Sequence, residues 1–195
     1  MKRFVSVTVL SLLLACVAPA QAQIASEVLY NLDFVDLYAE VTPDRSEMQV
    51  MADLFLQGNG SDPVVLRCDG NFQRWEITGE QKNLAFGVHV PYFYLYNLAS
   101  GPQVVHFKYL VRREGWETVN GGLIRPDKLE LNAGSYWYPR NVASDPHQVI
   151  LHLVSPDGYL VSTNASMTKD VPNNFKRLRR FLLSNPLAEG ITLQK

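Results

Sequence analysis

MQVMADLFL, residues 48–56, places an apolar side chain at every second position. These positions are Met48, Val50, Ala52, Leu54 and Leu56, and a period of two is typical of a strand with one buried face. Residues 32–41 alternate more loosely, and the intervening Thr42-Pro43-Asp44-Arg45 has the composition of a turn. We therefore expect two half-buried strands that pair with each other.

Turn residues recur at short intervals along the chain. Gly, Asn, Asp and Pro cluster at 57–63 and again at 69–71, which leaves little room for helices. Further extended candidates are Val64–Cys68, Phe86–Val90, Tyr92–Leu98, Val104–Val111, Lys128–Leu131, His147–Val154 and Tyr159–Thr163. Pro156-Asp157-Gly158 separates the last two and predicts a hairpin between them. The pattern as a whole predicts a mostly β chain, folded as an antiparallel β-sandwich.

The periodicity changes near the carboxyl end. Residues 172–184 combine apolar side chains at helical spacing with basic side chains between them, namely Phe175, Leu178, Phe181 and Leu182 with Lys176, Arg177, Arg179 and Arg180. Asn173 and Asn174 are candidate caps, and Pro186 ends the segment. We therefore expect one C-terminal amphipathic helix, after which the last residues can return as a strand.

Composition and charge exclude several classes of protein. The 195 residues are 47% hydrophobic and 19% charged, as in an ordinary globular protein. Lys and Arg number 18 against 19 Asp and Glu, and the basic residues do not cluster before the final quarter, so nucleic acid is not an expected partner. A single domain typically has about 100–200 residues, and we assign residues 23–195 to one domain.

Residues 1–22 have the pattern of a secretory signal peptide. Lys2 and Arg3 precede the apolar run Phe4–Ala18, and Ala20-Gln21-Ala22 forms a small-residue cleavage site. Removing Lys2 and Arg3 lowers the basic count from 18 to 16 against 19 acidic residues, a net charge of −3. The mature chain is therefore expected in the periplasm or outside the cell.

The two cysteines have different expected roles. Leu13-Leu14-Ala15-Cys16 resembles a bacterial lipobox, in which case Cys16 is lipidated and holds the protein at the membrane of the cell envelope. This is the alternative to cleavage after Ala22, and the only case in which we expect a membrane contact. Cys68 follows the alternation of the preceding residues, so we expect a small buried side chain rather than a reactive thiol.

No motif for catalysis, metal binding or cofactor binding stands out. None of the four histidines lies in a His-Glu-x-x-His pattern, and Gly58-Asn59-Gly60 lacks the third glycine of a dinucleotide loop. The sequence also contains no Gly-x-Ser-x-Gly elbow. The acidic residues Asp33, Asp36, Glu40 and Asp44 lie close in sequence and leave open a small hydrolase with a carboxylate pair. We otherwise expect no catalytic residue, no metal and no cofactor.

Two aromatic clusters are the candidate binding residues. They are Tyr92, Tyr94 and Tyr96 in the first cluster and Tyr136, Trp137 and Tyr138 in the second. Aromatic rings can bind a peptide or a sugar by stacking, with a polar tip on tyrosine. Alternation directs about half of each run into the core of a sandwich, so the outward members are the expected contacts.

Several short segments of strand and turn residues occur in a characteristic order along most of the mature chain. They are Tyr30–Phe34 with Thr42-Pro43-Asp44, Val105–Tyr109, Tyr136-Trp137-Tyr138-Pro139-Arg140, and Val149–Val154 followed by Pro156–Asn164. Together these segments resemble the amino-terminal domain of the aminopeptidase N family of zinc metallopeptidases. Asn164 stands where the family usually has glycine. The resemblance implies a β-sandwich fold.

The same resemblance does not imply catalysis. In that family a following domain binds the zinc ion through a His-Glu-x-x-His helix and a glutamate, and a Gly-x-Met-x-Asn loop holds the substrate. None of these motifs occurs in the 195 residues. We therefore interpret the chain as an exported, non-catalytic module that binds a protein or peptide partner. The alternatives are an envelope lipoprotein with a structural or assembly role and the small hydrolase named above.

Overall fold

Strands make up most of the structure. The computed structural model describes residues 31–58, 60, 63–68, 71–81, 83–112, 123–133, 136–142 and 145–195, so the signal-peptide segment and Cys16 lie outside the described residues. Within that part of the chain the helical structure is the short 3-10 turn η1 (Pro43–Arg45), and no helix is long and apolar enough to cross a membrane. The predicted mostly β class is confirmed.

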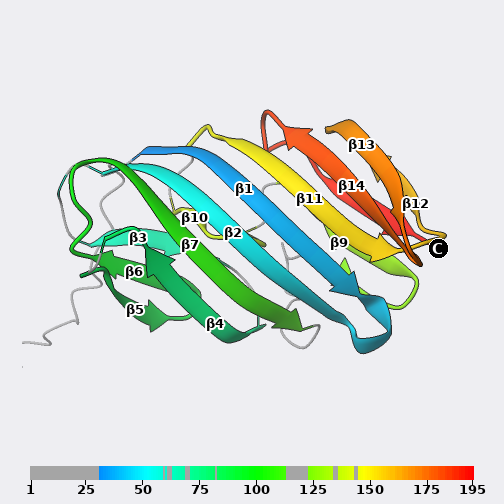
Figure 1. Cartoon of the computed structure of the whole chain (residues 1–195), viewed down its shortest axis with the longest axis horizontal. Helices are drawn as coiled ribbons and strands as arrows, with labels where there is room; N and C mark the ends of the chain where they lie inside the picture. The colour runs from blue at the N-terminus through cyan, green and yellow to red at the C-terminus, as the bar shows by residue number, and fades with distance from the viewer. Residues whose placement is uncertain are drawn as a thin grey trace, which may run out of the picture.

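The described strands form three sheets (Figure 1). The large sheet has the order β13 (Ser166–Asn173), β14 (Lys176–Leu183), β11 (Gln148–Pro156), β1 (Asn31–Thr42), β2 (Glu47–Gly58), β7 (Gly101–Arg112), β4 (Asn71–Gly79). One small sheet has the order β10 (Arg140–Asn141), β3 (Val64–Arg67), β6 (Tyr92–Tyr96), β5 (Ala85–His89). The other has the order β12 (Leu160–Thr163), β15 (Ile191–Gln194), β9 (Lys128–Leu131), β8 (Leu123–Ile124).

The first two strands pair as the sequence predicts. β1 and β2 are antiparallel, with Leu37 opposite Ala52 and Ala39 opposite Val50. Between them η1 makes the turn, and Ser46 takes the left-handed conformation that reverses the chain. β1 pairs on its other side with β11 in parallel, so this pair departs from the antiparallel arrangement expected from the sequence.

A row of paired residues crosses five strands of the large sheet and defines its inner face. Residues directly opposite each other in neighbouring strands point to the same side of a sheet, and the row runs Phe107, Ala52, Leu37, Leu151, Phe181. All five side chains are buried. The large sheet therefore has one continuous apolar face.

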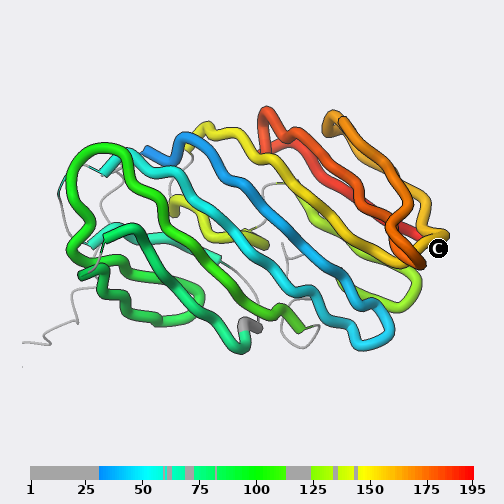
Figure 2. The backbone as a smooth tube through the Cα atoms, in the orientation of Figure 1, coloured from blue at the N-terminus to red at the C-terminus, as the bar shows by residue number. Residues whose placement is uncertain are grey.

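Both small sheets contribute to the core on that face. On β6, Phe93 meets Phe107 of β7 with ring centroids 5.7 Å apart, and Leu193 of β15 is fully buried in the same core cluster. The views show β3, β5 and β6 toward one end of the large sheet and β12 toward the other (Figures 1 and 2). One hydrophobic core is thus shared by residues from all three sheets.

The predicted C-terminal helix is wrong, because residues 166–183 form the hairpin β13–β14. In β14 the side chains of Arg179, Phe181 and Leu183 are buried at alternate positions. An arginine among the buried positions hides the period of two in a hydrophobicity pattern, so the remaining apolar residues show a helical spacing. The hairpin turns at Asn174, which has a positive φ of 51°, and the neighbouring Phe175 is exposed to solvent.

The predicted hairpin at Pro156-Asp157-Gly158 is also wrong. β11 pairs with β14 in the large sheet, whereas β12 pairs with β15 in a small one. The turn itself forms, since the Asp157 carboxylate accepts a hydrogen bond from Gly158 N at 3.0 Å and Gly158 has a φ of 88°. The turn carries the chain from one sheet to another. Its local chemistry is the same as that of a hairpin turn, so the sequence of the turn does not distinguish the two cases.

Two phenylalanine variants test the strand arrangement of residues 176–183. Phe181→Ala should lower the free energy of unfolding by about 3–5 kcal/mol, because it removes a fully buried ring. Phe175→Ala, at the exposed tip of the hairpin, should change it by less than about 0.5 kcal/mol. Urea unfolding of both variants measures this. An amphipathic helix would bury both rings, so comparable losses in the two variants would contradict the hairpin.

Candidate functional site

Three of the candidate tyrosines lie on the outer face of a small sheet. In β6, Tyr92, Tyr94 and Tyr96 alternate with the buried Phe93 and Leu95. The tyrosines retain partial exposure, which is greatest for Tyr96 at 39%. The alternation expected from the sequence thus directs the tyrosines outward and the more apolar side chains into the core.

Tyr136 joins the same face through arginine stacking. Arg67 of β3 lies opposite Tyr92 of β6, and its guanidinium stands 4.3 Å from the centroid of the Tyr136 ring. Arg140 of β10 lies 4.2 Å from the same centroid, and the Tyr136 hydroxyl donates to Val142 O at 3.0 Å. Cation–π contacts of this kind hold a ring in place. We call Tyr92, Tyr94, Tyr96 and Tyr136 the tyrosine surface.

The other two candidate aromatics lie in the core. Trp137 is 3% exposed and Tyr138 is 1% exposed, and their rings contact each other at 4.8 Å between centroids. The Trp137 carbonyl accepts a hydrogen bond from the hydroxyl of the buried Tyr109 at 3.1 Å. Two consecutive rings are buried because this segment bends rather than alternating as a strand. Partner binding by the six aromatics stays a prediction, and four of them keep partial exposure to solvent.

A buried polar network supports the segment that carries Tyr136. The Tyr138 hydroxyl lies 2.8 Å from Nε2 of His147, and Nδ1 of His147 lies 2.7 Å from Asp145 O. A carbonyl only accepts, so Nδ1 carries the proton and Nε2 accepts from Tyr138. The Asp145 carboxylate accepts from Leu32 N at 2.9 Å and from Asn141. Burial lowers the pKa of His147, which favours this neutral form.

An exposed aromatic pair, which was not predicted from the sequence, joins two sheet edges. Trp75 of β4 and Phe86 of β5 pack edge to face, with centroids 5.4 Å apart. They are 39% and 40% exposed. β4 is the last described strand of the large sheet, and β5 is the last described strand of its small sheet. No sequence signal shows this contact, because it depends on two edges meeting in space.

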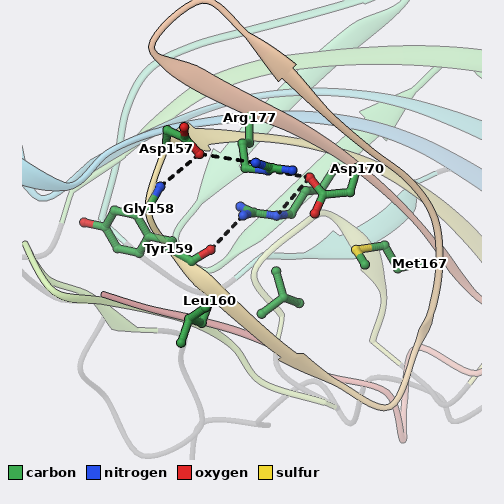
Figure 3. Close-up of a pocket in the computed structure, with 9 residues that line it drawn as sticks. Asp157, Gly158, Tyr159, Leu160, Met167, Asp170 and Arg177 are labelled. Carbon is green, nitrogen blue, oxygen red and sulfur yellow. Dashed lines mark hydrogen bonds and ion pairs between the residues drawn. The ribbon is translucent and has the colours of Figure 1, made fainter.

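A polar pocket lies at the opposite end of the molecule. A cavity of about 390 Å³ is lined by residues of the β11–β12 turn, of β12 and of the hairpin β13–β14 (Figure 3). They are Asp157, Gly158, Tyr159, Leu160, Val161, Met167, Asp170, Arg177 and Arg179. Both arginines were predicted on the polar face of a helix, so no sequence signal indicated this pocket.

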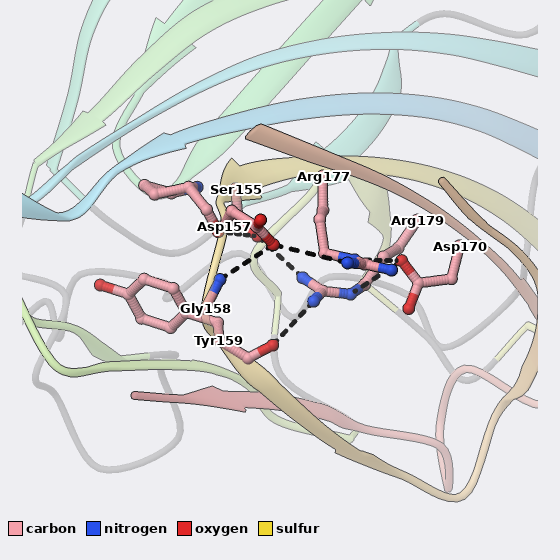
Figure 4. A network of polar contacts seen from close by, with 8 residues as sticks. Ser155, Asp157, Gly158, Tyr159, Asp170, Arg177 and Arg179 are labelled. Atoms are coloured by element: carbon pink, nitrogen blue, oxygen red, sulfur yellow. Dashed lines mark hydrogen bonds and ion pairs between the residues drawn. The ribbon is translucent and has the colours of Figure 1, made fainter. Parts of the chain in front are cut away.

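Two guanidinium groups and two carboxylates form one wall of this pocket (Figure 4). Arg177 Nε donates to Asp170 at 2.7 Å, and its Nη1 lies 3.5 Å from Asp157. Arg179 donates through Nη1 to Ser155 Oγ at 2.9 Å and through Nη2 to Tyr159 O at 2.7 Å. The hydrogen bond to Asp170 raises the pKa of Arg177, whereas burial lowers the pKa of Arg179.

Three of the four acidic residues that were candidates for a catalytic carboxylate pair have cationic or amide side chains as partners. Asp36 pairs with His152 at 3.4 Å, Glu40 pairs with Lys176, and Asp33 accepts from Asn31 and Gln57. Among the described residues, no group of three His, Cys, Asp or Glu side chains is placed to hold a metal ion. Cys68 is buried, as expected.

Comparison with known proteins identifies the fold. No protein-family model matches the sequence, and a search of curated proteins returned no match. Among solved structures, the chain is similar to an M1 zinc metallopeptidase from Deinococcus radiodurans, with a TM-score of 0.68, 13% identity and coverage of 86% of this chain and 43% of that chain. A mutant of that enzyme bound to a Tyr-Ser-Ala substrate gives a TM-score of 0.66 at 15% identity, covering 85% and 42%.

A two-domain M1 zinc metallopeptidase mutant bound to L-tryptophan gives a TM-score of 0.67 at 14% identity, covering 86% of this chain and 43% of the other. The chain thus spans less than half the length of the metallopeptidases it matches. It has the fold of the amino-terminal domain of the M1 zinc metallopeptidases, and the resemblance predicted from the sequence is confirmed.

The buried histidine predicts acid sensitivity. Because burial holds the pKa of folded His147 below its ordinary 6.5, the unfolded chain takes up the proton first as the pH falls. The stabilisation is fully present above pH 6.5 and is lost as the pH falls toward the folded-state pKa. Urea unfolding at a series of pH values should show a decrease of at most about 1.4 kcal/mol per pH unit from this group.

His147→Gln should flatten that dependence, because the amide does not titrate. The matched control is His106→Gln, since His106 lies partly exposed beside Asp53 and not in the core. An unchanged pH slope in His147→Gln would show that another group causes the acid sensitivity.

Proposed function

We propose that the chain is an exported, non-catalytic β-sandwich module that binds an extended segment of a protein or peptide partner. The observation that carries this proposal is the tyrosine surface beside the open edge of β5. The fold of an M1 amino-terminal domain supports it, because the similar metallopeptidases extend well beyond the matched part. The proposed partner is a peptide in strand conformation.

The β5 edge is suited to strand addition. β5 pairs with β6 on one side, and in the described structure no strand pairs with it on the other. An unpaired edge offers backbone N–H and C=O groups to an extended peptide, which gives affinity, while neighbouring side chains give specificity. Edge strands that avoid such pairing often carry lysine or proline, and β5 (Ala85–His89) has neither.

The side chains around β5 offer contacts on both faces of an added strand. On the outer face Gly87 lies opposite Tyr94, and the Tyr96 ring lies within van der Waals distance of the position that a Gly87 Cβ would take. On the inner face Phe86 and Trp75 stand exposed as a pair. An added strand with alternating apolar side chains would bury both sets of rings, and aromatic anchors of this kind dominate binding energy.

Selection from a displayed library of random peptides tests the proposed binding. Peptides that bind the protein should lose about 10-fold or more in affinity with Tyr94→Ala and Phe86→Ala, because both rings lie beside the β5 edge. Phe175→Ala removes an exposed ring at a remote hairpin tip and should leave affinity unchanged. Isothermal titration calorimetry of each variant measures the effect.

Methylating the peptide backbone tests how the peptide binds. N-methylation is placed on every second peptide residue, in one peptide at the odd positions and in another at the even positions. One of the two peptides should lose binding, since an added strand uses every second N–H. Equal loss of affinity in Tyr94→Ala and Phe175→Ala, or unchanged binding of both methylated peptides, would reject strand addition at β5.

Intact mass of the protein exported from a bacterial host tests its processing. Cleavage after Ala22 should leave a mature chain that begins at Gln23, because Ala20-Gln21-Ala22 meets the requirements of signal peptidase. A chain that begins at a lipid-modified Cys16 would instead support the lipoprotein alternative. Cys16→Ser should leave the mass of the mature chain unchanged in the first case and prevent membrane anchoring in the second.

A further inference from the structure

The pocket between β12 and β13 contains a buried cation with an unused hydrogen-bond donor. Arg179 is 2% exposed, and its Nε has no hydrogen-bond partner within the described structure. The same Nε forms an ion pair with an Asp170 carboxylate oxygen at 3.6 Å, which is beyond hydrogen-bond distance. A buried donor without an acceptor carries a desolvation cost, and an oxygen acceptor placed in the pocket would relieve it.

The second guanidinium is partly available to a ligand. Arg177 binds Asp170 firmly at 2.7 Å, whereas its contact with Asp157 measures 3.5 Å. The Asp157 side chain is 58% exposed, so it can move away without opening the core. The outer N–H groups of the Arg177 guanidinium can then donate hydrogen bonds to another carboxylate in place of Asp157, in the bidentate geometry that guanidinium groups favour.

Apolar side chains also line the pocket. Leu160 on β12 is 77% exposed and Met167 on β13 is 46% exposed, and both line the cavity beside the ionic wall (Figure 3). Their two strands are edges of different sheets. The cavity of about 390 Å³ has the size of a small-molecule site. Its lining thus combines cationic donors with apolar side chains.

We propose that this pocket binds a carboxylate carried on a small apolar group. The carboxylate pairs with Arg177 and reaches Arg179 Nε, and the apolar group packs on Leu160 and Met167. Either the last residue of a peptide or a short free fatty acid has this chemistry. The site is independent of the tyrosine surface, which lies on another sheet at the other end of the molecule (Figure 1).

Removing a charge from the pocket should strengthen or weaken binding according to the sign of that charge. Asp157 competes for Arg177, so Asp157→Asn should tighten binding by about 3-fold or more, and the asparagine oxygen still accepts the hydrogen bond from Gly158 N. Arg177→Gln should weaken binding by about 10-fold or more. Arg177 is partly exposed, so this variant is expected to fold. A pocket for cationic ligands would show the opposite signs.

The probes are N-acetyl-L-leucine and hexanoate, titrated into the ¹⁵N-labelled protein, with N-acetyl-L-leucinamide as the uncharged match. The Nε–H resonance of Arg179 should shift with the carboxylates and not with the amide. A lower dissociation constant for N-acetyl-L-leucine indicates a peptide terminus, and a lower one for hexanoate indicates a fatty acid. No shift at about 10 mM probe, equal binding of the amide, or weaker binding in Asp157→Asn would overturn the proposal.

Discussion

The structure depends on one continuous apolar face of the large sheet. The row from Phe107 to Phe181 crosses five strands and is buried throughout, and the two small sheets both contribute to the core on that side. Burial of apolar area is the dominant favourable term in folding, and here a single face supplies much of it. The opposite face carries paired polar groups such as His106 with Asp53.

The two ends of this core are closed in different ways. At the β4 and β5 edges an aromatic pair, Trp75 with Phe86, joins two sheets. At the β12 and β13 edges Arg179 takes an inward position of β14 and is held by Ser155, Tyr159 and the nearby Asp170. The aromatic pair leaves an exposed apolar surface, and the inward arginine leaves a polar cavity. Both proposed binding sites arise at these ends, where sheet edges leave side chains incompletely covered.

Much of the strand content could be predicted from the sequence, whereas strand pairing could not. The pattern located β1, β2, β3, β5, β6, β7, β9, β11 and β12 to within a few residues. It missed β4, where a bulge between Gln73 and Glu76 and the positive φ of Arg74 interrupt the period. It misassigned β14, because an inward arginine is stabilised by partners distant in sequence. The turn at Gly158 was recognised, but its local chemistry does not determine which sheet the next strand joins.

The candidate site could also be predicted only in part from the sequence. Tyr92, Tyr94 and Tyr96 follow the alternation of a strand, and their outward direction follows from the greater apolarity of Phe93 and Leu95. Trp137 and Tyr138 lie in a bend, where alternation does not apply, and both are buried. The pocket lined by Arg177 and Arg179 required the hairpin, the β11–β12 turn and β12 to be placed together, which no local pattern encodes.

The central position of β1 has a consequence for the order of folding. β1 lies between β2 and β11, and Phe34 pairs with Gln148. β2 follows β1 immediately and can pair as soon as it is made, but β11 arrives only after most of the chain. Until then one edge of β1 stays open, and open edges invite pairing between chains. The growing chain is therefore most exposed to aggregation before β11 closes the sheet.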